Sequence, residues 1–179
     1  MNQVRIIGGI WKRRLIAFDS INGLRPTPDR VRETLFNWLM WDISGKNVLD
    51  VCAGSGALGI EALSRGAAEC ILIEADRKQA EQIKSSLTQL QCTTATVVCA
   101  KAEQALLQLN DKFDLVFLDP PYALNLWAPL SEMIDPLLNV EAKIYVEADQ
   151  PLTQLKLPSR WKLIKQTRAG QVYAGLFEV

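Results

Sequence analysis

The stretch Asn47-Val-Leu-Asp-Val-Cys-Ala-Gly-Ser-Gly-Ala-Leu-Gly59 indicates the fold class of this chain of 179 residues. Its first five residues predict a short buried strand. The glycines at positions 54, 56 and 59 suit a tight turn, close approach of the backbone to a ligand, and close packing of a helix on the strand. Residues 57–65 have helical spacing and are followed by Gly66, a good helix C-terminus. Strand, glycine loop and helix in this order predict a nucleotide site in an α/β sheet.

A carboxylate is expected to face this loop from the next strand. Residues 70–74, Cys-Ile-Leu-Ile-Glu, form an apolar run that ends in an acid 18 residues after Gly56, where a carboxylate can hold both ribose hydroxyls of a nucleoside. The glycine spacing also fits NAD, but Asp50 would repel a pyrophosphate and can help hold an ammonium group. The residues therefore favour S-adenosylmethionine, which has an ammonium, a sulfonium and no phosphate. The expected cofactor contacts are Asp50, Ala53, Gly54, Ser55, Gly56 and Glu74.

A second motif follows another predicted strand. The apolar run 113–118 leads into Asp119-Pro-Pro-Tyr122, and the two prolines prevent both ladder pairing and an immediate helix. The chain must turn at the carboxyl end of the strand, where open α/β sheets bind ligands. Asp119 and the Pro120 carbonyl can accept the two hydrogens of a planar exocyclic amine, and Tyr122 can stack on its ring. A proline turn with a capping Asp and a core Tyr would explain the tetrapeptide alone equally well.

Composition excludes several other chemistries. The chain has no histidine, which rules out acid–base mechanisms that use histidine and zinc sites with mixed Cys/His ligands. Its four cysteines lack Cys-x-x-Cys spacing, so buried reduced thiols and no metal are expected, and Cys52 has no histidine to activate it as a nucleophile. No apolar run approaches the ~18 residues of a membrane span, and residues 1–15 lack the apolar centre of a signal peptide. We expect a cytoplasmic enzyme that has no membrane partner.

Positive charge is concentrated near the amino terminus, although the formal net charge is zero. Residues 1–35 hold seven basic and three acidic groups, a balance of +4, and the other 144 residues hold 13 basic and 17 acidic groups, a balance of −4. Such an arm suits contacts with nucleic-acid phosphates, although a solvated surface is the commoner explanation of an isolated charge run. The expected RNA contacts are Arg5, Lys12, Arg13, Arg14, Arg25, Arg30 and Arg32.

The order of the predicted elements indicates a mostly parallel sheet. A small hairpin is expected over residues 4–7 and 14–18, and a helix from Thr27, its N-cap, to about residue 40. Helices and strands then alternate: Asp76 caps a helix, strands are expected at 95–98, 114–118 and 144–147, and helices at 102–109 and 126–137. Residues 161–168 and 172–179 predict a terminal hairpin. This pattern implies an α/β sheet with right-handed crossovers and one antiparallel strand.

Seven segments spread over nearly the whole chain form one recognisable set. They are Arg5-Ile-Ile-Gly-Gly9, Arg25-Pro-Thr-Pro-Asp-Arg-Val-Arg-Glu-Thr-Leu-Phe-Asn-Trp38, Ala53-Gly-Ser-Gly-Ala-Leu-Gly59, Glu61-Ala-Leu-Ser-Arg65, Asp119-Pro-Pro-Tyr122, Ile144-Tyr-Val-Glu147 and Ala169-Gly-Gln-Val172. Together they resemble the RsmD family of bacterial methyltransferases. The arginine-rich block at the amino terminus is the specific part, because the glycine loop and Asp-Pro-Pro-Tyr occur in many amino-methyltransferases. At position 101 the chain departs from the family pattern, since it has Lys where Asn or Asp is usual.

The resemblance implies a fold, an activity and partners. The fold is a Rossmann-like class I methyltransferase sheet, mostly parallel with a terminal antiparallel hairpin, preceded by a small β-hairpin and helix. A single domain, 1–179, would divide into a basic extension, 1–41, and a cofactor-binding and catalytic core, 42–179. The implied reaction is S-adenosylmethionine-dependent methylation of a guanine N2 amine in 16S ribosomal RNA. The substrate would be presented on small ribosomal subunit particles, where ribosomal proteins are further candidate partners.

The implied chemistry explains the candidate catalytic residues, Asp119, Pro120, Pro121 and Tyr122. The guanine N2 lone pair is delocalised into the ring, and acceptance of both amine hydrogens would free it to attack the sulfonium methyl group. A paired base is inaccessible and must be flipped out or already unpaired.

Three alternative functions stay open on the residues alone. A DNA adenine-N6 methyltransferase would use the same motif but generally needs a separate target-recognition domain. A protein-glutamine methyltransferase would more usually carry Asn at position 119. A non-catalytic RNA-binding module would leave Asp50, Glu74 and Asp119 without a purpose.

Overall fold

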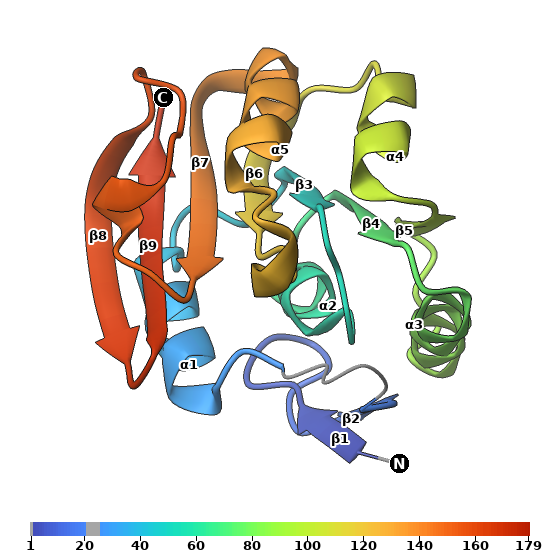
Figure 1. Cartoon of the computed structure of the whole chain (residues 1–179). Coiled ribbons are helices and arrows are strands. Elements are labelled where there is room, and N and C mark those ends of the chain that lie inside the picture. The colour runs from blue at the N-terminus through green and yellow to red at the C-terminus, as the bar shows by residue number, and fades with distance from the viewer. Residues whose placement is uncertain (1, 21–25) are drawn as a thin grey trace.

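A central sheet of seven strands organises the chain, with the strand order β5-β4-β3-β6-β7-β9-β8 (Figure 1). The computed structural model describes residues 2–20 and 26–179. Strand β9 pairs antiparallel with both β7 and β8, and the other pairings in this sheet are parallel. The strands are β3 (Asn47–Asp50), β4 (Glu69–Glu74), β5 (Ala95–Cys99), β6 (Phe113–Leu118), β7 (Leu138–Ala148), β8 (Lys162–Ala169) and β9 (Val172–Glu178).

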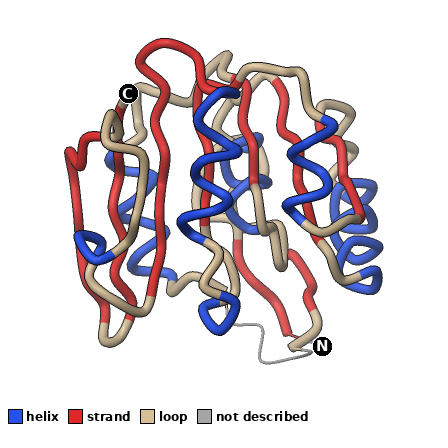
Figure 2. The backbone as a smooth tube through the Cα atoms, turned by 45° about the horizontal axis from the view of Figure 1, so that its top comes forward, coloured by secondary structure: helices blue, strands red, loops and turns tan. Residues whose placement is uncertain are grey.

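Helices cover both faces of the sheet and give it two separate cores (Figures 1 and 2). Alternate strand residues point to opposite faces: Val48 belongs to the core under α1, α2 and α3, whereas its neighbour Leu49 belongs to the core under α4 and α5. The helices are α1 (Asp29–Trp38), α2 (Ala57–Ser64), α3 (Arg77–Gln89), α4 (Ala102–Gln108) and α5 (Trp127–Ile134), with 3₁₀ turns η2 (Tyr122–Leu124), η3 (Asp135–Leu137) and η4 (Leu152–Gln154).

A small hairpin, β1 (Asn2–Arg5) and β2 (Leu15–Phe18), lies at the end of the molecule toward which β6 and β7 point (Figure 1). It is anchored to the main body by hydrogen bonds. The backbone N–H of Ile10 donates to the Ser64 carbonyl of α2 at 2.8 Å. The Arg14 guanidinium donates to the Gln89 carbonyl of α3 at 3.1 Å. Ser64 and Gln89 are the last residues of α2 and α3, so these bonds hold the turn end of the hairpin at the C-terminal ends of the two helices.

Most of the predicted elements are confirmed, including the terminal hairpin and the single antiparallel strand. The Asp76 cap is also confirmed, because its carboxylate accepts from the N–H of Gln79 at 2.9 Å. The Thr27 cap is wrong: Pro28 is the N-cap of α1 and makes no side-chain bond, while Thr27 is buried. Strand β7 begins at Leu138, six residues before the predicted position 144.

The direction of the chain across the sheet reverses between β3 and β6. From β3 the chain proceeds outward through β4 and β5, and then returns to place β6 on the other side of β3. In open α/β sheets, ligands bind at such a switch point, outside the carboxyl ends of the two central strands. We call this position, at the ends of β3 and β6, the crevice.

Candidate active site

Four acidic side chains meet at this crevice. Asp50 is the last residue of β3, Glu74 the last of β4, Asp119 directly follows β6, and Glu147 is the penultimate residue of β7. The parallel register aligns the strands, pairing Asp50 with Leu72 on one side and with Phe117 on the other. The sheet thus brings together the two predicted motifs, the glycine loop and the Asp-Pro-Pro-Tyr turn.

The glycine loop has the backbone that its sequence predicts. Gly54 and Gly56 adopt positive φ angles of 57° and 81°, which L side chains rarely adopt. At Gly59, a Cβ atom would stand 2.8 Å from Leu72 Cδ2, so this glycine allows α2 to pack closely on β4. The Ala53 and Ser55 side chains are buried, and these two residues would therefore meet a cofactor mainly through their backbone.

Asp50 and Glu74 both hold backbone N–H groups of this region. Asp50 Oδ2 accepts from Gly59 at 3.0 Å, and burial raises the pKa of this carboxyl to about 7, with Glu74 adding to the shift and the Gly59 bond opposing it. Glu74 accepts from Gly54 at 2.9 Å and from Asp76 at 2.7 Å. Burial raises the pKa of Glu74, and these two hydrogen bonds oppose the shift. A carboxylate has about four lone-pair sites, so Glu74 retains acceptor capacity for ribose hydroxyls.

The pKa of Cys52 reflects the acidic surroundings of the site. The pKa of its thiol is raised, first by burial and then by the nearby acidic residues Asp119, Asp50, Glu74 and Glu103. A thiol in this field stays protonated and is a poor nucleophile. The same field repels a pyrophosphate and favours a cationic ligand, so the donor set fits S-adenosylmethionine better than NAD. The four cysteines are free, but Cys70 alone is buried; Cys52 and Cys92 are partly exposed and Cys99 is exposed, which corrects the expectation that all four are buried.

The Asp-Pro-Pro-Tyr turn presents a partly exposed Asp119 and a half-buried Tyr122 to the crevice. Burial raises the pKa of Asp119 well above its usual range, and the neighbouring Glu147 and Asp50 add to the shift. Tyr122 begins the 3₁₀ turn η2, and its ring stacks on Trp127 with centroids 6.0 Å apart and an interplanar angle of 27°. Its hydroxyl donates to Glu147 Oε2 at 3.2 Å. Pro120 is buried behind the turn and Pro121 is exposed.

Sequence reasoning gave no role to Glu147, although its segment was among the matching motifs. The side chain is 3% exposed and also accepts from the Tyr145 hydroxyl at 2.7 Å, while its backbone carbonyl accepts from the Trp127 indole at 3.0 Å. The available signal was a polar pair two residues apart in an otherwise apolar strand, since such residues share one face.

The basic arm divides into exposed and buried residues. Arg32 is 1% exposed and donates to Asp29 at 2.8 Å and to the Arg5 carbonyl at 3.2 Å. It also lies 3.7 Å from the buried Glu61, whose carboxylate accepts from the N–H groups of residues 7 and 8. The expectation that Arg32 contacts RNA is therefore wrong, because its charge is used to hold the amino-terminal segment. Arg5, Lys12, Arg13, Arg14 and Arg30 are exposed, and Arg25 lies outside the described residues.

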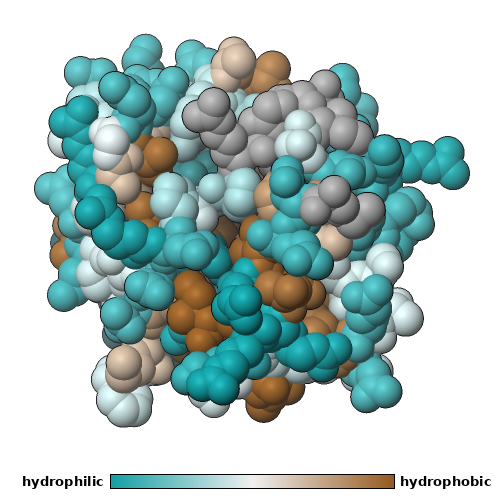
Figure 3. Space-filling view, turned by 90° about the horizontal axis from the view of Figure 1, so that it is seen from below, coloured by the Kyte–Doolittle hydropathy of each residue, from teal (hydrophilic) through white to brown (hydrophobic). Residues whose placement is uncertain are grey.

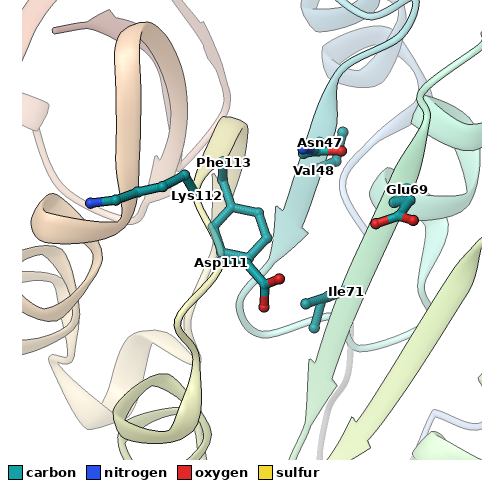
Figure 4. A pocket seen from close by; sticks show the side chains of 7 residues that line it. All are labelled: Asn47, Val48, Glu69, Ile71, Asp111, Lys112 and Phe113. Carbon is teal, nitrogen blue, oxygen red and sulfur yellow. The ribbon is translucent and has the colours of Figure 1, made fainter.

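Hollows occur at both ends of the sheet. Figure 3 shows the molecule from below Figure 1, where hydrophilic residues cover most of the visible face and hydrophobic ones lie between them near its centre. A hollow of about 430 Å³ is lined by Asn125, Trp127, Gln150 and Lys156, among others, and so lies beside the Tyr122 turn. A smaller cavity of about 90 Å³ lies at the opposite end, where Asn47, Glu69 and Phe113 begin their strands (Figure 4). The second cavity is thus remote from the acidic crevice.

Within residues 2–20 and 26–179, no group of three or more Cys, Asp or Glu side chains is placed to hold a metal ion. In the same ranges, no helix is long and apolar enough to cross a membrane.

Lys101, which departs from the family pattern, is exposed at the N-cap of α4 beyond the end of β5 and makes no capping bond with its side chain.

The strand order, the glycine loop and the acidic crevice together define a class I methyltransferase, the class that uses S-adenosylmethionine. The family model described as Conserved hypothetical protein 95 matches residues 4–178. The chain belongs to this family, which is the RsmD family that its motifs resemble.

Named relatives and a solved structure agree with this assignment. Ribosomal RNA small subunit methyltransferase D from Escherichia coli (strain K12) is 44% identical in an alignment 181 positions long, which covers 98% of this chain and 90% of that protein. The protein of the same name from Haemophilus influenzae is 41% identical in an alignment 184 positions long, which covers 98% of this chain and 94% of that protein. The structure of the putative methyltransferase yhhF from Escherichia coli superimposes with a TM-score of 0.89 at 42% identity, over 99% of this chain and 98% of that chain.

Proposed function

We propose that this protein transfers a methyl group from S-adenosylmethionine to the exocyclic N2 amine of a guanine in 16S ribosomal RNA, within small-subunit particles in the cytoplasm. The observation that carries the proposal is the meeting of the Asp-Pro-Pro-Tyr turn and the glycine loop at one crevice. The names of the relatives, which specify a ribosomal RNA small subunit methyltransferase, support RNA as the substrate class.

The cofactor would lie across the glycine loop, at the ends of β3 and β4. Glu74 would hold the ribose hydroxyls, the backbone of residues 53–56 would line the amino-acid part, and Asp50 would attract the ammonium group. When bound, S-adenosylmethionine supplies an electrophilic methyl group on a sulfonium. The negative field that raises the pKa of Cys52 stabilises such a cation.

The turn would position the target amine. Asp119 and the Pro120 carbonyl would accept its two hydrogens, which favours a more tetrahedral nitrogen with a free lone pair. The nitrogen would then attack the methyl carbon in line, and most of the rate enhancement would come from positioning and electrostatics. One face of the Tyr122 ring would stack on the flipped base, while the other packs on Trp127 and the hydroxyl bonds to Glu147.

The exposed basic residues would bind the RNA backbone. Arg5, Lys12, Arg13 and Arg14 are exposed on or beside the anchored hairpin. Arg30 is exposed at the start of α1. Phosphate contacts from these residues would orient the subunit particle, and the base would be chosen at the crevice.

Methyl transfer to defined substrates tests the proposal. The protein would be incubated with labelled S-adenosylmethionine and, separately, small ribosomal subunits that lack the modification, naked 16S RNA, DNA and protein. We expect label in RNA from the subunits, recovered as N2-methylguanosine after digestion, and label that forms about 100-fold or more slowly with Asp119→Ala. Label recovered as N6-methyladenine in DNA, or on protein glutamine, would replace the proposed function with one of the alternatives.

A further inference from the structure

Two carboxyl groups lie against each other at the base of the crevice. Leu118 of β6 and Val146 of β7 are register partners, so the next residue on each strand brings Asp119 beside Glu147. Besides burial, Glu147 raises the pKa of Asp119 by its negative charge and by a hydrogen bond between the two side chains. Because carboxylates only accept hydrogen bonds, a bond between two carboxyl groups requires that one of them carries a proton.

The surroundings of the pair indicate where that proton resides. Glu147 accepts from two hydroxyls, Tyr145 at 2.7 Å on Oε1 and Tyr122 at 3.2 Å on Oε2. Hydrogen bonds donated to a carboxyl group favour its ionised form. Glu147 is therefore the acceptor within the pair, and Asp119, whose pKa is raised well above its usual range by burial and by Glu147, is the donor.

Charges around the pair favour retention of this proton. Asp50 on β3 adds negative charge near Asp119, and Asp149, beyond the end of β7, adds it near Tyr122. The two tyrosines contribute neutral hydroxyls, since burial and Glu147 raise the pKa of each above its usual range. In a buried acidic site two neighbouring carboxyl groups rarely ionise together.

We propose that Asp119 and Glu147 share one proton, and that Glu147 takes it over when Asp119 accepts the proton released by the methylated amine. Glu147 is then a positioning and proton-holding residue that acts through Asp119. This inference rests on the proposed function, because it needs an amine substrate at the turn.

The step balances without a further reactant. The amine nitrogen forms a bond to the methyl carbon as the carbon–sulfur bond breaks, which leaves a neutral thioether and a positively charged amine. One amine proton moves to the outer oxygen of Asp119, while the proton already on Asp119 moves to Glu147. The pair, which began with one proton and one negative charge, ends with two protons and no charge. It returns the extra proton to water after the product leaves.

The shared proton also accounts for the orientation of the turn. A protonated oxygen of Asp119 that donates to Glu147 leaves the other oxygen as the acceptor for the target amine. A hydrogen bond to the backbone helps to fix the position of Glu147, since the Trp127 indole N–H donates to the Glu147 carbonyl at 3.0 Å. The acceptor is thus preorganised before substrate binds.

Glu147→Gln tests the proposal, because glutamine keeps the size and polarity of the side chain but cannot take the proton. Glu141→Gln, the same change at an exposed position near the start of the same strand, is the matched control. Single-turnover methyl transfer, KM for small subunits, S-adenosylmethionine affinity and melting temperature would be measured for each. We expect Glu147→Gln to lose about 100-fold or more in the chemical rate, in the range of a general acid–base contribution. Its KM and cofactor affinity should stay within about twofold of those of the unmodified protein.

Other results would overturn the inference. A Glu147→Gln protein with an unchanged chemical rate would show that no proton is passed to Glu147. A loss matched by weaker cofactor binding and a lower melting temperature would show a structural role only. Tyr145→Phe removes one bond to Glu147 but leaves its carboxyl group, so a loss as large as that of Glu147→Gln would equally contradict the proton role. The unmodified protein distinguishes a failure of this inference from a failure of the proposed function. If the proposed function is wrong, the unmodified protein methylates a different amine, and Glu147→Gln is then compared with Glu141→Gln on that amine.

Discussion

The Oε1 atom of Glu74 accepts a hydrogen bond of 2.9 Å from the backbone N–H of Gly54, so the carboxylate at the end of β4 holds the glycine loop directly. Its second oxygen holds the N–H of Asp76 at the start of α3. The residue expected to bind ribose therefore also shapes the loop, and the two roles must be separated by the choice of substitution.

Glu74→Ala should weaken S-adenosylmethionine binding by about 1.5–3 kcal/mol, the scale of a lost hydrogen bond to a charged group. It also leaves the Gly54 N–H without its acceptor, so the melting temperature should fall as well. Glu74→Gln retains one oxygen for the loop and should separate the effects, with weaker binding and a smaller loss of stability. Calorimetry and thermal melts measure both. Unchanged affinity in both variants would remove Glu74 from the cofactor site.

Asp50 should make cofactor binding depend on pH near neutrality. Its carboxyl has a pKa of about 7, so it is neutral below this pH and negatively charged above it. If it attracts the ammonium group, affinity should rise between pH 6 and pH 8, by about tenfold per pH unit at most for a single proton. Calorimetry of Asp50→Asn should show no such rise. Equal pH dependence in the two proteins would place the titrating group elsewhere.

The same carboxyl should affect stability in the opposite direction. The pKa of Asp50 is raised on folding, so its contribution to stability is fully present below the unfolded pKa of about 3.9 and is lost as pH rises through about 7. Without cofactor, Asp50→Asn should therefore melt above the unmodified protein at pH 8 and lose this advantage toward pH 4. An advantage that is the same at both pH values would argue against a buried, protonated Asp50.

The sequence predicted the parts of the site that local chemistry determines. Positive φ angles at Gly54 and Gly56 follow from residue type, and the crevice follows from the alternation of strands and helices. Contacts between distant segments were not predictable. The bond between Tyr122 and Glu147 spans 25 residues, and the one between Ile7 and Glu61 spans 54. Arg32 was misassigned for this reason, since a count of charges does not show which of them face inward.

The arm should therefore separate into stabilising and RNA-binding charges. Arg32→Ala leaves the buried Glu61 with one charged partner fewer, which should cost about 3–5 kcal/mol of folding free energy. Neutralising the exposed Lys12 and Arg13 should leave stability nearly unchanged and flatten the salt dependence of RNA binding. The log–log slope should change by roughly 0.7–0.9 for each phosphate that the protein no longer binds. Chemical denaturation and binding titrations at several salt concentrations measure the two effects, and an unaltered slope would show a solvated surface.

The Asp-Pro-Pro-Tyr turn should separate chemistry from binding. Asp119→Ala removes the acceptor for the target amine and leaves the glycine loop intact, so methyl transfer should fall by about 100-fold or more, the scale of one preorganised polar group. Cofactor affinity should change far less. Tyr122→Ala should instead lose about 1–3 kcal/mol of base stacking and raise KM for the subunits. Tyr122→Phe keeps the ring and loses only the bond to Glu147, which retains the bond from Tyr145, so a modest loss of about 0.5–1.5 kcal/mol is expected. Single-turnover and steady-state kinetics resolve the rate from KM. Near-normal turnover by Asp119→Ala on small subunits would show that the turn is merely structural and that the amine is activated by another group.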